Sequence, residues 1–313
     1  MSERATETKL ILVKRRTRLE ELAWRHNTEE QARFYIESRG EDFDVYIHED
    51  QSYRASLAAA ETTLSRIGRV QTLDRDFLSN FIFGAQDVVV VLGQDGLVAN
   101  TLKYLHGQPV VAVNPDPARI DGVLLPFQVA DLDAVLKELL KAKRPIKRVS
   151  MAEASLNDGQ TMVAVNDFFI GPKNHTSLRY EIDFRESSEM HSSSGVIVST
   201  GLGSTGWMRS VIAGSLGVAR ARGAQGDSAD AYQPLSWDAQ KLLFSVREPF
   251  PSNTTQTELV YGEITGGEAL TIKSRVPENG VIFSDGMISD AIEFNSGAVV
   301  NISLSQRYGS IVH

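Results

Sequence analysis

The sequence contains no cysteine, which excludes disulfide bonds, thiolate zinc sites and cysteine nucleophiles. Long apolar runs are also missing, and the longest, Val88–Leu92, is far too short to cross a bilayer. Basic residues are outnumbered, with 32 Lys and Arg against 40 Asp and Glu, so the chain lacks the basic excess typical of nucleic-acid binders. The N-terminal residues 1–9 resemble neither a signal peptide nor a transit peptide. These absences predict a cytoplasmic protein that binds neither membranes nor nucleic acids.

Paired histidines at metal-ligand spacing are missing as well. The six histidines are scattered along the chain, so we expect no structural metal site. In contrast, apolar residues make up 42% of the 313 residues, which is enough for a buried core. A chain of this length favours two domains.

The first half of the chain alternates strand-like and helix-like patterns. Val88–Leu92 is typical of a strand that is buried on both faces of a parallel sheet. Strands that alternate with helices indicate βαβ units, so we expect an α/β domain with a parallel, Rossmann-like sheet. The expected strands are Leu10–Val13, Val45–Ile47, Val88–Leu92 and Val110–Val113, and the expected helices are Arg18–Ser38, Ala55–Ile67, Gly96–Leu105 and Leu132–Lys141.

After residue 143 the pattern changes to one short strand after another. These segments are rich in β-branched residues and are separated by Gly, Asn and Pro, which predicts a mainly β domain. We therefore expect two domains, residues 1–143 and residues 144–313. The expected strands of the second domain are Thr161–Ile170, Arg179–Phe184, Gly195–Ser199, Lys241–Val246, Ala269–Ser274, Val281–Phe283 and Ala298–Leu304. Residues Arg220–Ser236, rich in Ala, Gly, Asp and Gln, are interpreted as a mobile surface insertion.

The first candidate site is the turn Gly93-Gln94-Asp95-Gly96, which follows the buried strand Val88–Leu92. Ligands of α/β sheets bind beyond the carboxyl ends of the strands, where helix N-termini present free N–H groups to phosphates. Glycines allow the backbone to approach a ligand closely. The Asp95 carboxylate is placed where it could accept a proton from a hydroxyl group. The alternative is an ordinary strand-to-helix turn in which Asp95 caps the helix.

The second candidate is the pair Asn166-Asp167, which interrupts an otherwise apolar strand. Buried amides and carboxylates need partners, and this pair could hold ribose hydroxyls. A β-bulge or a turn is the alternative interpretation. A later acidic turn, Asp285-Gly286, is interpreted as a simple hairpin connection.

The third candidate is the segment Ser192–Trp207, in which a strand leads into a loop of Gly, Ser and Thr. Such a loop can fold its N–H groups and hydroxyls around a nucleotide. It lacks the lysine of a P-loop, and a flexible loop is the alternative.

In this order the three motifs resemble those of the NAD kinases. That family carries Gly-Gly-Asp-Gly after a strand of an α/β domain, then Asn-Glu in a β-rich domain, then a segment rich in Gly, Ser and Thr that ends in Ala-Tyr. The resemblance looks closest to the divergent branch that includes the mitochondrial NAD kinase. Further matching stretches are Leu12–Lys14, Val113–Pro117, Asn166–Gly171, Ser193–Gly195, Leu243–Pro249 and Glu293–Gly297.

The resemblance implies a role for each matched residue. Asp95 corresponds to the catalytic carboxylate that takes the proton of the 2′-hydroxyl of the NAD adenosine. Asn166 and Asp167 correspond to the pair that holds NAD, and Thr205 to a contact with adenine. Ser194 stands where other members use an aspartate for the nicotinamide amide. Gly93, Gly96 and Gly206 complete the implied NAD-binding residues, and Trp207 replaces a family tyrosine.

The reaction implied by the resemblance is transfer of the γ-phosphate of Mg²⁺–ATP to NAD, which makes NADP. Positioning and charge neutralisation dominate phosphoryl transfer, and Lys14 and Arg15, at the end of the first strand, are candidates to bind the triphosphate. Asp95 would need only an ordinary carboxylate pKa of about 4. The resemblance also implies a homodimer or a larger homo-oligomer. Whether NAD or NADH accepts the phosphate, and whether ATP or polyphosphate donates it, stays open.

Three departures from the family pattern suggest an alternative function. Gln94 stands where the family has its second glycine, Leu97 replaces a threonine, and Leu202 replaces a hydroxyl residue near adenine. A chain with these changes could be a catalytically weak or inactive protein that binds or senses NAD or NADP. A third possibility is a kinase of another hydroxylated substrate, because lipid kinases share a related glycine-aspartate turn.

Overall fold

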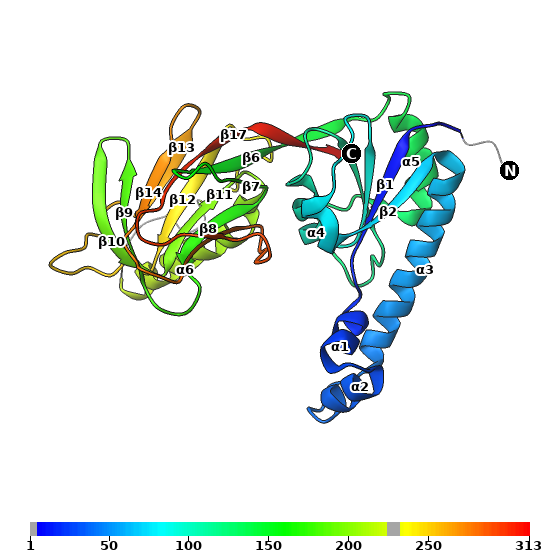
Figure 1. Cartoon of the computed structure of the whole chain (residues 1–313), viewed down its shortest axis with the longest axis horizontal. Helices are drawn as coiled ribbons and strands as arrows, with labels where there is room; N and C mark the ends of the chain where they lie inside the picture. The colour runs from blue at the N-terminus through cyan, green and yellow to red at the C-terminus, as the bar shows by residue number, and fades with distance from the viewer. Residues whose placement is uncertain (1–4, 224–231) are drawn as a thin grey trace. The chain divides into compact units, whose positions relative to one another are not determined.

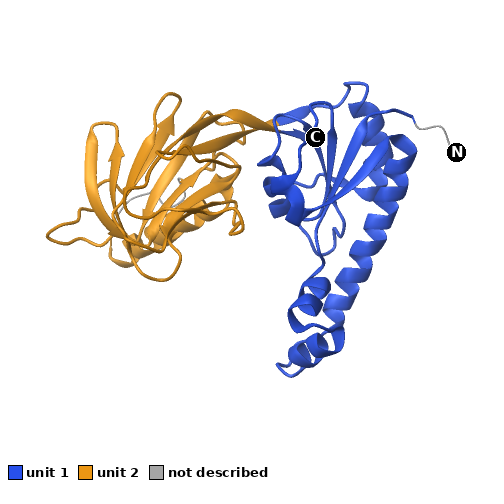
Figure 2. Cartoon of the chain, in the orientation of Figure 1, with its two compact units in different colours: residues 1–147, 310–313 blue, residues 148–309 orange. Residues whose placement is uncertain are grey.

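The structure, a computed structural model, describes residues 5–223 and 232–313. The chain forms two compact units (Figure 1 and Figure 2). Unit 1 comprises residues 1–147 and the final residues 310–313, and unit 2 comprises residues 148–309. The chain therefore returns to its first unit at the C-terminus.

Unit 1 is a parallel sheet with helices. Its strands are β1 (Lys9–Lys14), β2 (Arg69–Asp74), β3 (Val88–Leu92), β4 (Pro109–Asn114) and β5 (Phe127–Gln128). Its helices are α1 (Arg18–His26), α2 (Glu29–Glu37), α3 (Asp44–Ile67), α4 (Asp95–Leu102) and α5 (Leu132–Leu139), with short 3₁₀ turns at Arg75–Asn80 and Val129–Asp131. The sheet order is β4-β3-β1-β2, and β5 and residues 310–311 of the last strand also pair in parallel with β4.

The core of unit 1 lies between the sheet and helices α3 and α5. β3 is fully buried along its length, as expected for a strand covered on both faces. Tyr53, Leu64 and Ile67 of α3 and Leu136 of α5 pack against the strands. The sheet is thus held by the helices that follow β1 and β5.

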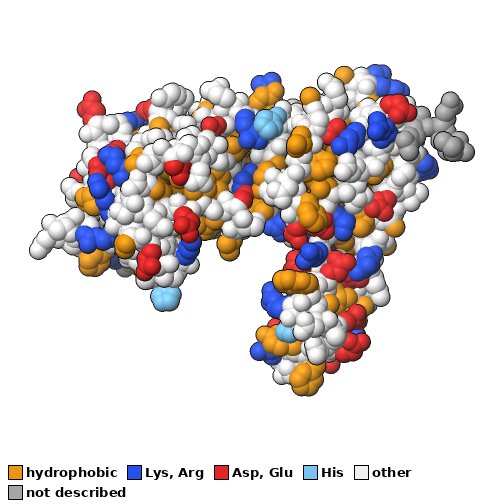
Figure 3. Space-filling model, viewed as in Figure 1, with side chains coloured by type: hydrophobic (Ala, Val, Ile, Leu, Met, Phe, Trp, Pro, Cys, Tyr) orange, Lys and Arg blue, Asp and Glu red, His pale blue; other side chains and the backbone are white. Residues whose placement is uncertain are grey.

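Helices α1 and α2 form a short hairpin against the start of α3. Thr17 and Glu20 make a capping box that starts α1, and the Thr28 side chain caps α2. Trp24 and Phe34 are 76% and 75% exposed. Figure 3 shows hydrophobic side chains on the surface over these two helices. The hairpin buries one face and leaves aromatic side chains on the other.

Unit 2 is mainly β. Its strands are β6 (Ile146–Leu156), β7 (Thr161–Ala164), β8 (Asp167–Pro172), β9 (Leu178–Phe184), β10 (Ser187–Ser193), β11 (Gly195–Ser199), β12 (Lys241–Arg247), β13 (Tyr261–Thr265), β14 (Leu270–Ser274), β15 (Gly280–Ser284), β16 (Ile292–Glu293) and β17 (Val299–Val312). A 3₁₀ turn (Gly203–Thr205) leads into α6 (Trp207–Ala221). One sheet has the order β13-β12-β11-β8-β15-β16 with antiparallel pairs, and the other contains β10-β9-β14-β17 with β6 and β7.

The main core of unit 2 lies between these two sheets, and α6 covers the other face of the first. Alternation along β8 shows both layers, because Phe168 and Ile170 face the inter-sheet core while Phe169 packs with Met208 of α6. The expected fold class, an α/β unit plus a mainly β unit, is confirmed.

Several expected elements differ in detail. Val45–Ile47 is not a strand, because it lies in the long helix α3, where Tyr46 joins a helical-hairpin core. Arg18–Ser38 is two helices rather than one, divided at the Thr28 cap. The expected strand Thr161–Ile170 is interrupted between β7 and β8, at Val165-Asn166.

The expected insertion Arg220–Ser236 falls partly outside the described residues, since 224–231 are not described. At its start, Arg220 and Ala221 complete α6. At its end, the Tyr232 hydroxyl donates to the Ser204 carbonyl at 2.7 Å, and Leu235 N donates to Ser204 Oγ at 2.9 Å. The described part of this segment is therefore bonded to the rest of unit 2.

Candidate functional site

The first motif forms the turn between β3 and α4. Gly93 N donates to the Val113 carbonyl at 3.2 Å, which ties the turn to β4. A Cβ on Gly93 would lie 2.7 Å from Cδ2 of the buried Leu97, so the leucine side chain needs a glycine here. Leu97 thus belongs to the core and presents no hydroxyl to a ligand. Gly96 has open space around its Cα.

Asp95 is the first residue of α4 and does not cap it, because Gln94 occupies the cap position without a side-chain bond. The Asp95 carboxylate instead accepts N–H groups from the loop after β4. Leu124 N lies 2.9 Å from Oδ1 and Val123 N lies 3.1 Å from Oδ2. Each oxygen keeps a second lone pair, so the half-buried carboxylate can still accept a hydroxyl.

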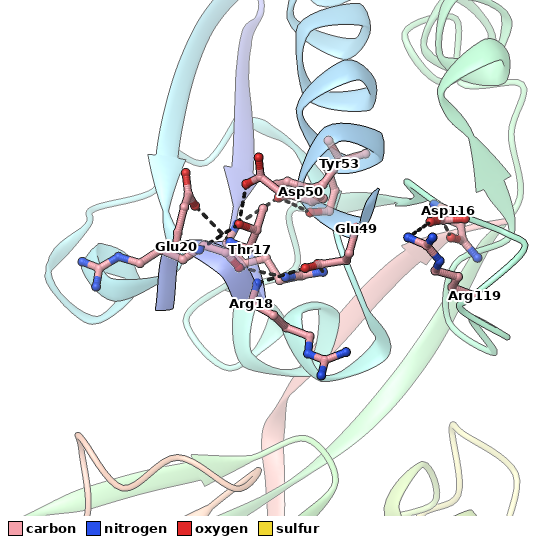
Figure 4. Close-up of polar contacts among 12 residues, drawn as sticks. Thr17, Arg18, Glu20, Glu49, Asp50, Tyr53, Asp116 and Arg119 are labelled. Carbon is pink, nitrogen blue, oxygen red and sulfur yellow. Dashed lines mark hydrogen bonds and ion pairs between the residues drawn. The ribbon is translucent and has the colours of Figure 1, made fainter. Parts of the chain in front are cut away.

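The strand order places this turn at the topological switch point of the sheet. β1 lies between β2 and β3, so the chain adds β2 on one side of β1 and then β3 and β4 on the other side. A topological switch point is the place where the strand order reverses in this way. A cavity of about 120 Å³ lies beside the carboxyl ends of β1, β3 and β4 (Figure 4). We call it the arginine cavity; its lining residues are Arg15, Arg18, Val45, Glu49, Tyr53, Gln94, Pro115, Asp116, Arg119 and Ile120.

Arg15 is fixed on one wall of the arginine cavity. Its guanidinium lies 2.7 Å from Glu49 Oε1 and sits over the Tyr53 ring, 4.9 Å from the ring centre. The Tyr53 hydroxyl accepts Arg15 N–H at 3.0 Å and donates to the Leu92 carbonyl at 3.0 Å. Burial raises the pKa of Tyr53 to about 12, so this hydroxyl stays neutral. Lys14 does not line the cavity, and its Nζ lies 3.3 Å from Asp74 Oδ2.

A second polar network fixes the start of α1 against α3 (Figure 4). Thr17 Oγ1 donates to Asp50 Oδ1 at 2.6 Å, and Arg54 Nε donates to Asp50 Oδ2 at 2.7 Å. Arg54 also reaches Glu20 at 2.7 Å. These bonds hold the backbone beside the arginine cavity.

In unit 2, the second motif lies at the break between β7 and β8. Asn166 is half-buried, and its amide side chain makes no hydrogen bond among the described residues. Its backbone is held by Asp285, whose Oδ1 accepts Asn166 N at 2.6 Å and Val165 N at 3.1 Å. Asp285 is therefore more than a hairpin residue, because its carboxylate shapes the motif.

Asp167 follows at the start of β8, beside Ser199 of β11. The residue is 9% exposed, and its carboxylate has no hydrogen bond in the part of the chain that the structure describes. Burial, together with the negative charge of Asp285, raises the pKa of Asp167 to about 7. A buried, unbonded carboxylate that titrates near neutrality is typical of a functional site.

The third motif folds against the second. Thr200 N donates to the Asn166 carbonyl at 2.8 Å, and a Cβ on Gly203 would lie 2.0 Å from that carbonyl oxygen. Only glycine allows this approach. Thr205 and Gly206 are exposed next to the motif, and Leu202 is buried. The structure thus brings Asn166 and Asp167 together with the loop that carries Thr205 and Gly206.

Ser194 lies elsewhere in unit 2. It precedes β11 while the third motif's loop follows it, so the two stand at opposite ends of a five-residue strand, about 16 Å apart. Ser194 N donates to the Arg247 carbonyl at 3.1 Å. Arg247 borders a groove of about 640 Å³ between α6 and the end of β12. Trp207 lines the same groove and stacks on Phe169 with ring centres 5.6 Å apart.

A buried hydrogen-bond chain supports the turn that carries Ser194. His191 Nε2 lies 2.8 Å from Glu189 Oε2, and Tyr180 OH lies 2.9 Å from Ser193 Oγ. Ser193 Oγ accepts Gly195 N at 3.0 Å. Burial opposes ionisation of Glu189, but hydrogen bonds from His191 and from backbone N–H groups hold its pKa below the ordinary value.

Comparison with solved structures identifies the architecture. A crystal structure of an NAD kinase from Archaeoglobus fulgidus in complex with ATP matches over 98% of this chain and 94% of its own, with a TM-score of 0.57 and 14% identity. The yeast NADH kinase complexed with NADH matches over 98% of this chain and 83% of its own, with a TM-score of 0.60 and 14% identity. The chain has the NAD kinase fold. No protein-family model and no curated protein matches the sequence.

Within this NAD kinase fold, three residues are functional candidates that the sequence did not predict. Asp285 is distant in sequence from the motif that it holds, and only the pairing of β15 with β8 brings them together. Arg18 and Arg119 lie on the arginine cavity but belong to no recognisable motif. An arginine shortly after a strand of a parallel sheet was the available signal.

Among the described residues, no group of three or more His, Asp or Glu could hold a metal ion. The described helices include none that is both long and apolar enough to cross a membrane.

Proposed function

We propose that the protein is an ATP-dependent NAD kinase, which transfers the γ-phosphate of ATP to the 2′-hydroxyl of the NAD adenosine. The observation that carries this proposal is the placement of Asp95. It sits at the switch point of an NAD kinase fold, beside a cavity that holds three arginines. ATP and NADH are the ligands of the two solved neighbours.

In this proposal Asp95 orients the acceptor hydroxyl and takes its proton late in the transfer. Its two bonds to the backbone of Val123 and Leu124 fix the carboxylate, so little reorganisation is needed. Gly96, with open space around its Cα, keeps a side chain away from the reacting groups, while Gly93 leaves room for the buried Leu97. The proton leaves the 2′-oxygen as that oxygen bonds to phosphorus and the bond from the γ-phosphorus to the ADP oxygen breaks.

NAD would be held by the residues of unit 2. The free amide of Asn166 and the carboxylate of Asp167 can bind ribose hydroxyls, and the exposed Thr205 and Gly206 can contact the adenine. Ser194, at the far end of β11, would contact the nicotinamide amide.

The donor would bind at the arginine cavity, with Arg15 neutralising phosphate charge. Lys14 contributes in this proposal only when it leaves Asp74. Mg²⁺ would arrive with ATP as part of the donor, because magnesium sites of this type use phosphate oxygens and few carboxylates. We also infer a homo-oligomer, since exposed aromatics such as Trp24 and Phe34 are enriched at protein interfaces. The cytoplasmic location and the divergent branch stay part of the proposal on the sequence pattern alone.

The test is incubation of the purified full-length protein with NAD and Mg²⁺–ATP, with NADP formation as the readout. The Asp95→Asn variant keeps the shape of the turn but removes the proton acceptor. We expect the NADP formation rate to fall at least about 100-fold while NAD still binds. Equal rates for the two proteins would contradict the role of Asp95.

One observation favours a second candidate function, a nucleotide-binding protein with weak or no turnover. The Gln94 side chain lines the arginine cavity, where the family has a glycine. The Gln94→Gly variant distinguishes the two. If Gln94 blocks the donor, NADP formation should appear or increase in the variant. If the natural protein already forms NADP, Gln94→Gly should change the affinity for ATP more than the rate of NADP formation.

A further inference from the structure

We propose that Arg18 and Arg119 bind, together with Arg15, the terminal phosphates of a polyphosphate chain in the arginine cavity. The inference rests on the proposed function in that it names the donor-binding residues. It also goes further, because neither arginine belongs to a motif and the cavity can bind phosphate without any transfer reaction.

Arg18 supplies a positive charge that has no ion-pair partner among the residues that the structure describes. Its guanidinium stacks on the Tyr46 ring, 4.3 Å from the ring centre, and makes no ion pair among the described residues. The backbone N–H of Arg18 donates to Glu49 at 3.0 Å, so the start of α1 is fixed while the side chain remains available. A planar guanidinium held by an aromatic ring is well suited to bidentate phosphate binding.

Arg15 adds an unsatisfied donor. Its Nε is buried and has no hydrogen-bond partner within the described residues, although its NH2 group pairs with Glu49. Leaving a buried donor of a charged group unbonded costs free energy. The guanidinium of Arg15 therefore keeps hydrogen-bonding capacity that its described partners do not use, on a residue that lines the cavity.

Arg119 comes from the loop after β4, on another side of the cavity (Figure 4). The same loop is tied to Asp95 through Val123 and Leu124, so phosphate binding at Arg119 would be connected to the catalytic turn. Asp116 lies 3.5 Å from Arg119 and offsets part of its charge. Three guanidinium groups face two carboxylates, which leaves a positive excess.

The size of the cavity agrees with this ligand class. Its volume of about 120 Å³ corresponds to several water-sized spheres, at roughly 15 Å³ for each, which is enough for a tetrahedral phosphate. The lining contains no second aromatic face to enclose a base, because Tyr53 is already covered by Arg15. We therefore assign the cavity to phosphate groups rather than to the adenine.

The experiment is isothermal titration calorimetry of the full-length protein with tripolyphosphate and, separately, with ATP. Arg18→Gln and Arg119→Gln should each weaken binding of both ligands by about tenfold, the loss of one charge-assisted contact. Asp116→Asn should strengthen binding, because it removes a competing carboxylate.

The matched control is Arg16→Gln, since Arg16 is a neighbouring arginine that pairs with Asp76 and does not line the cavity. We expect its affinities to stay within about twofold of the natural protein, because surface ion pairs contribute little.

Two further measurements make the outcome decisive. NAD affinity should be unchanged in all four variants. Arg18→Lys, which keeps the positive charge, should bind tripolyphosphate and ATP more tightly than Arg18→Gln does. The proposal is overturned if Arg18→Gln and Arg119→Gln behave like Arg16→Gln, or if the natural protein binds neither tripolyphosphate nor ATP. If phosphate binding depends on both arginines but no NADP forms with either donor, the site stands and the kinase proposal fails.

Discussion

The environment of Asp167 makes the stability of the fold depend on pH. Its pKa of about 7 lies above the ordinary value of 3.8, so the folded state disfavours the ionised carboxylate. A raised pKa stabilises the fold below the ordinary pKa, and this contribution is lost as the pH rises toward 7. Each unit of pKa corresponds to about 1.4 kcal/mol, so the full effect is a few kcal/mol.

The Asp167→Asn variant tests this account. Asparagine cannot ionise, so the stability of the variant relative to the natural protein should increase from pH 4 to pH 7 and stay level above it. Urea unfolding of both proteins at pH 5 and pH 8 measures the difference. A difference that is the same at both pH values would contradict the raised pKa.

At the same scale, sequence reasoning could identify Asn166 and Asp167 but not the reason for their chemistry. An amide and a carboxylate in an apolar segment stand out because burial of polar groups is costly. The pKa of Asp167, however, is raised by burial in the folded protein and then by the charge of Asp285, more than a hundred residues later in the chain. Long-range charge pairs of this kind leave no local pattern.

Among the elements, the loop between β11 and α6 has the tightest backbone contact of the candidate site. A Cβ on Gly203 would lie 2.0 Å from the Asn166 carbonyl oxygen, a distance that real side chains never reach. Gly203→Ala should therefore displace Asn166, lower stability and abolish NAD binding. Gly217→Ala in α6 is the matched control, because nothing lies within 4 Å of its added methyl group.

The control should be stabilised by up to about 1 kcal/mol, since alanine is the better helix former. Thermal melts and NAD titration of both variants give the comparison. Normal NAD binding by Gly203→Ala would show that the contact between the two motifs is not needed for the site.

Prediction of the elements succeeded where the local pattern was uniformly apolar, as in β3, and failed where tertiary contacts decide the backbone conformation. Val45–Ile47 has a strand-like composition, but Tyr46 is buried in the core of the helical hairpin, and the segment continues the helix α3. The break after β7 exists because the Asp285 carboxylate holds the Val165 and Asn166 N–H groups. A carboxylate from a distant turn cannot be inferred from the strand that it interrupts.

At the level of the whole molecule, the chain ends in the unit where it began. Ile311 of β17 pairs in parallel with Val110 of β4 and is 1% exposed, so the last residues complete the sheet of unit 1. Ile311→Ala should destabilise the protein by about 2–5 kcal/mol, the cost of a buried large-to-small substitution. Ile288→Ala, at a position 82% exposed, should have little effect.

Denaturant unfolding of these two variants checks the prediction. If the Ile311 variant were as stable as the Ile288 variant, the final strand would contribute little to unit 1. Because residues 310–313 belong to unit 1, the chain passes between the two units twice.

The sequence by itself determined the fold class, since buried apolar strands alternating with helices admit few packings and the later short strands admit only a mainly β unit. It also singled out candidate residues: Asp95, because a carboxylate between glycines at a strand end is locally conspicuous, and Asn166 and Asp167, because an amide and a carboxylate interrupt an apolar segment. Only the tertiary structure decided which charges meet. Arg18 and Arg119 share a cavity, burial and the charge of Asp285 raise the pKa of Asp167, and Lys14 pairs with Asp74. Coulomb interactions act through space, between residues that strand order and not sequence distance brings together.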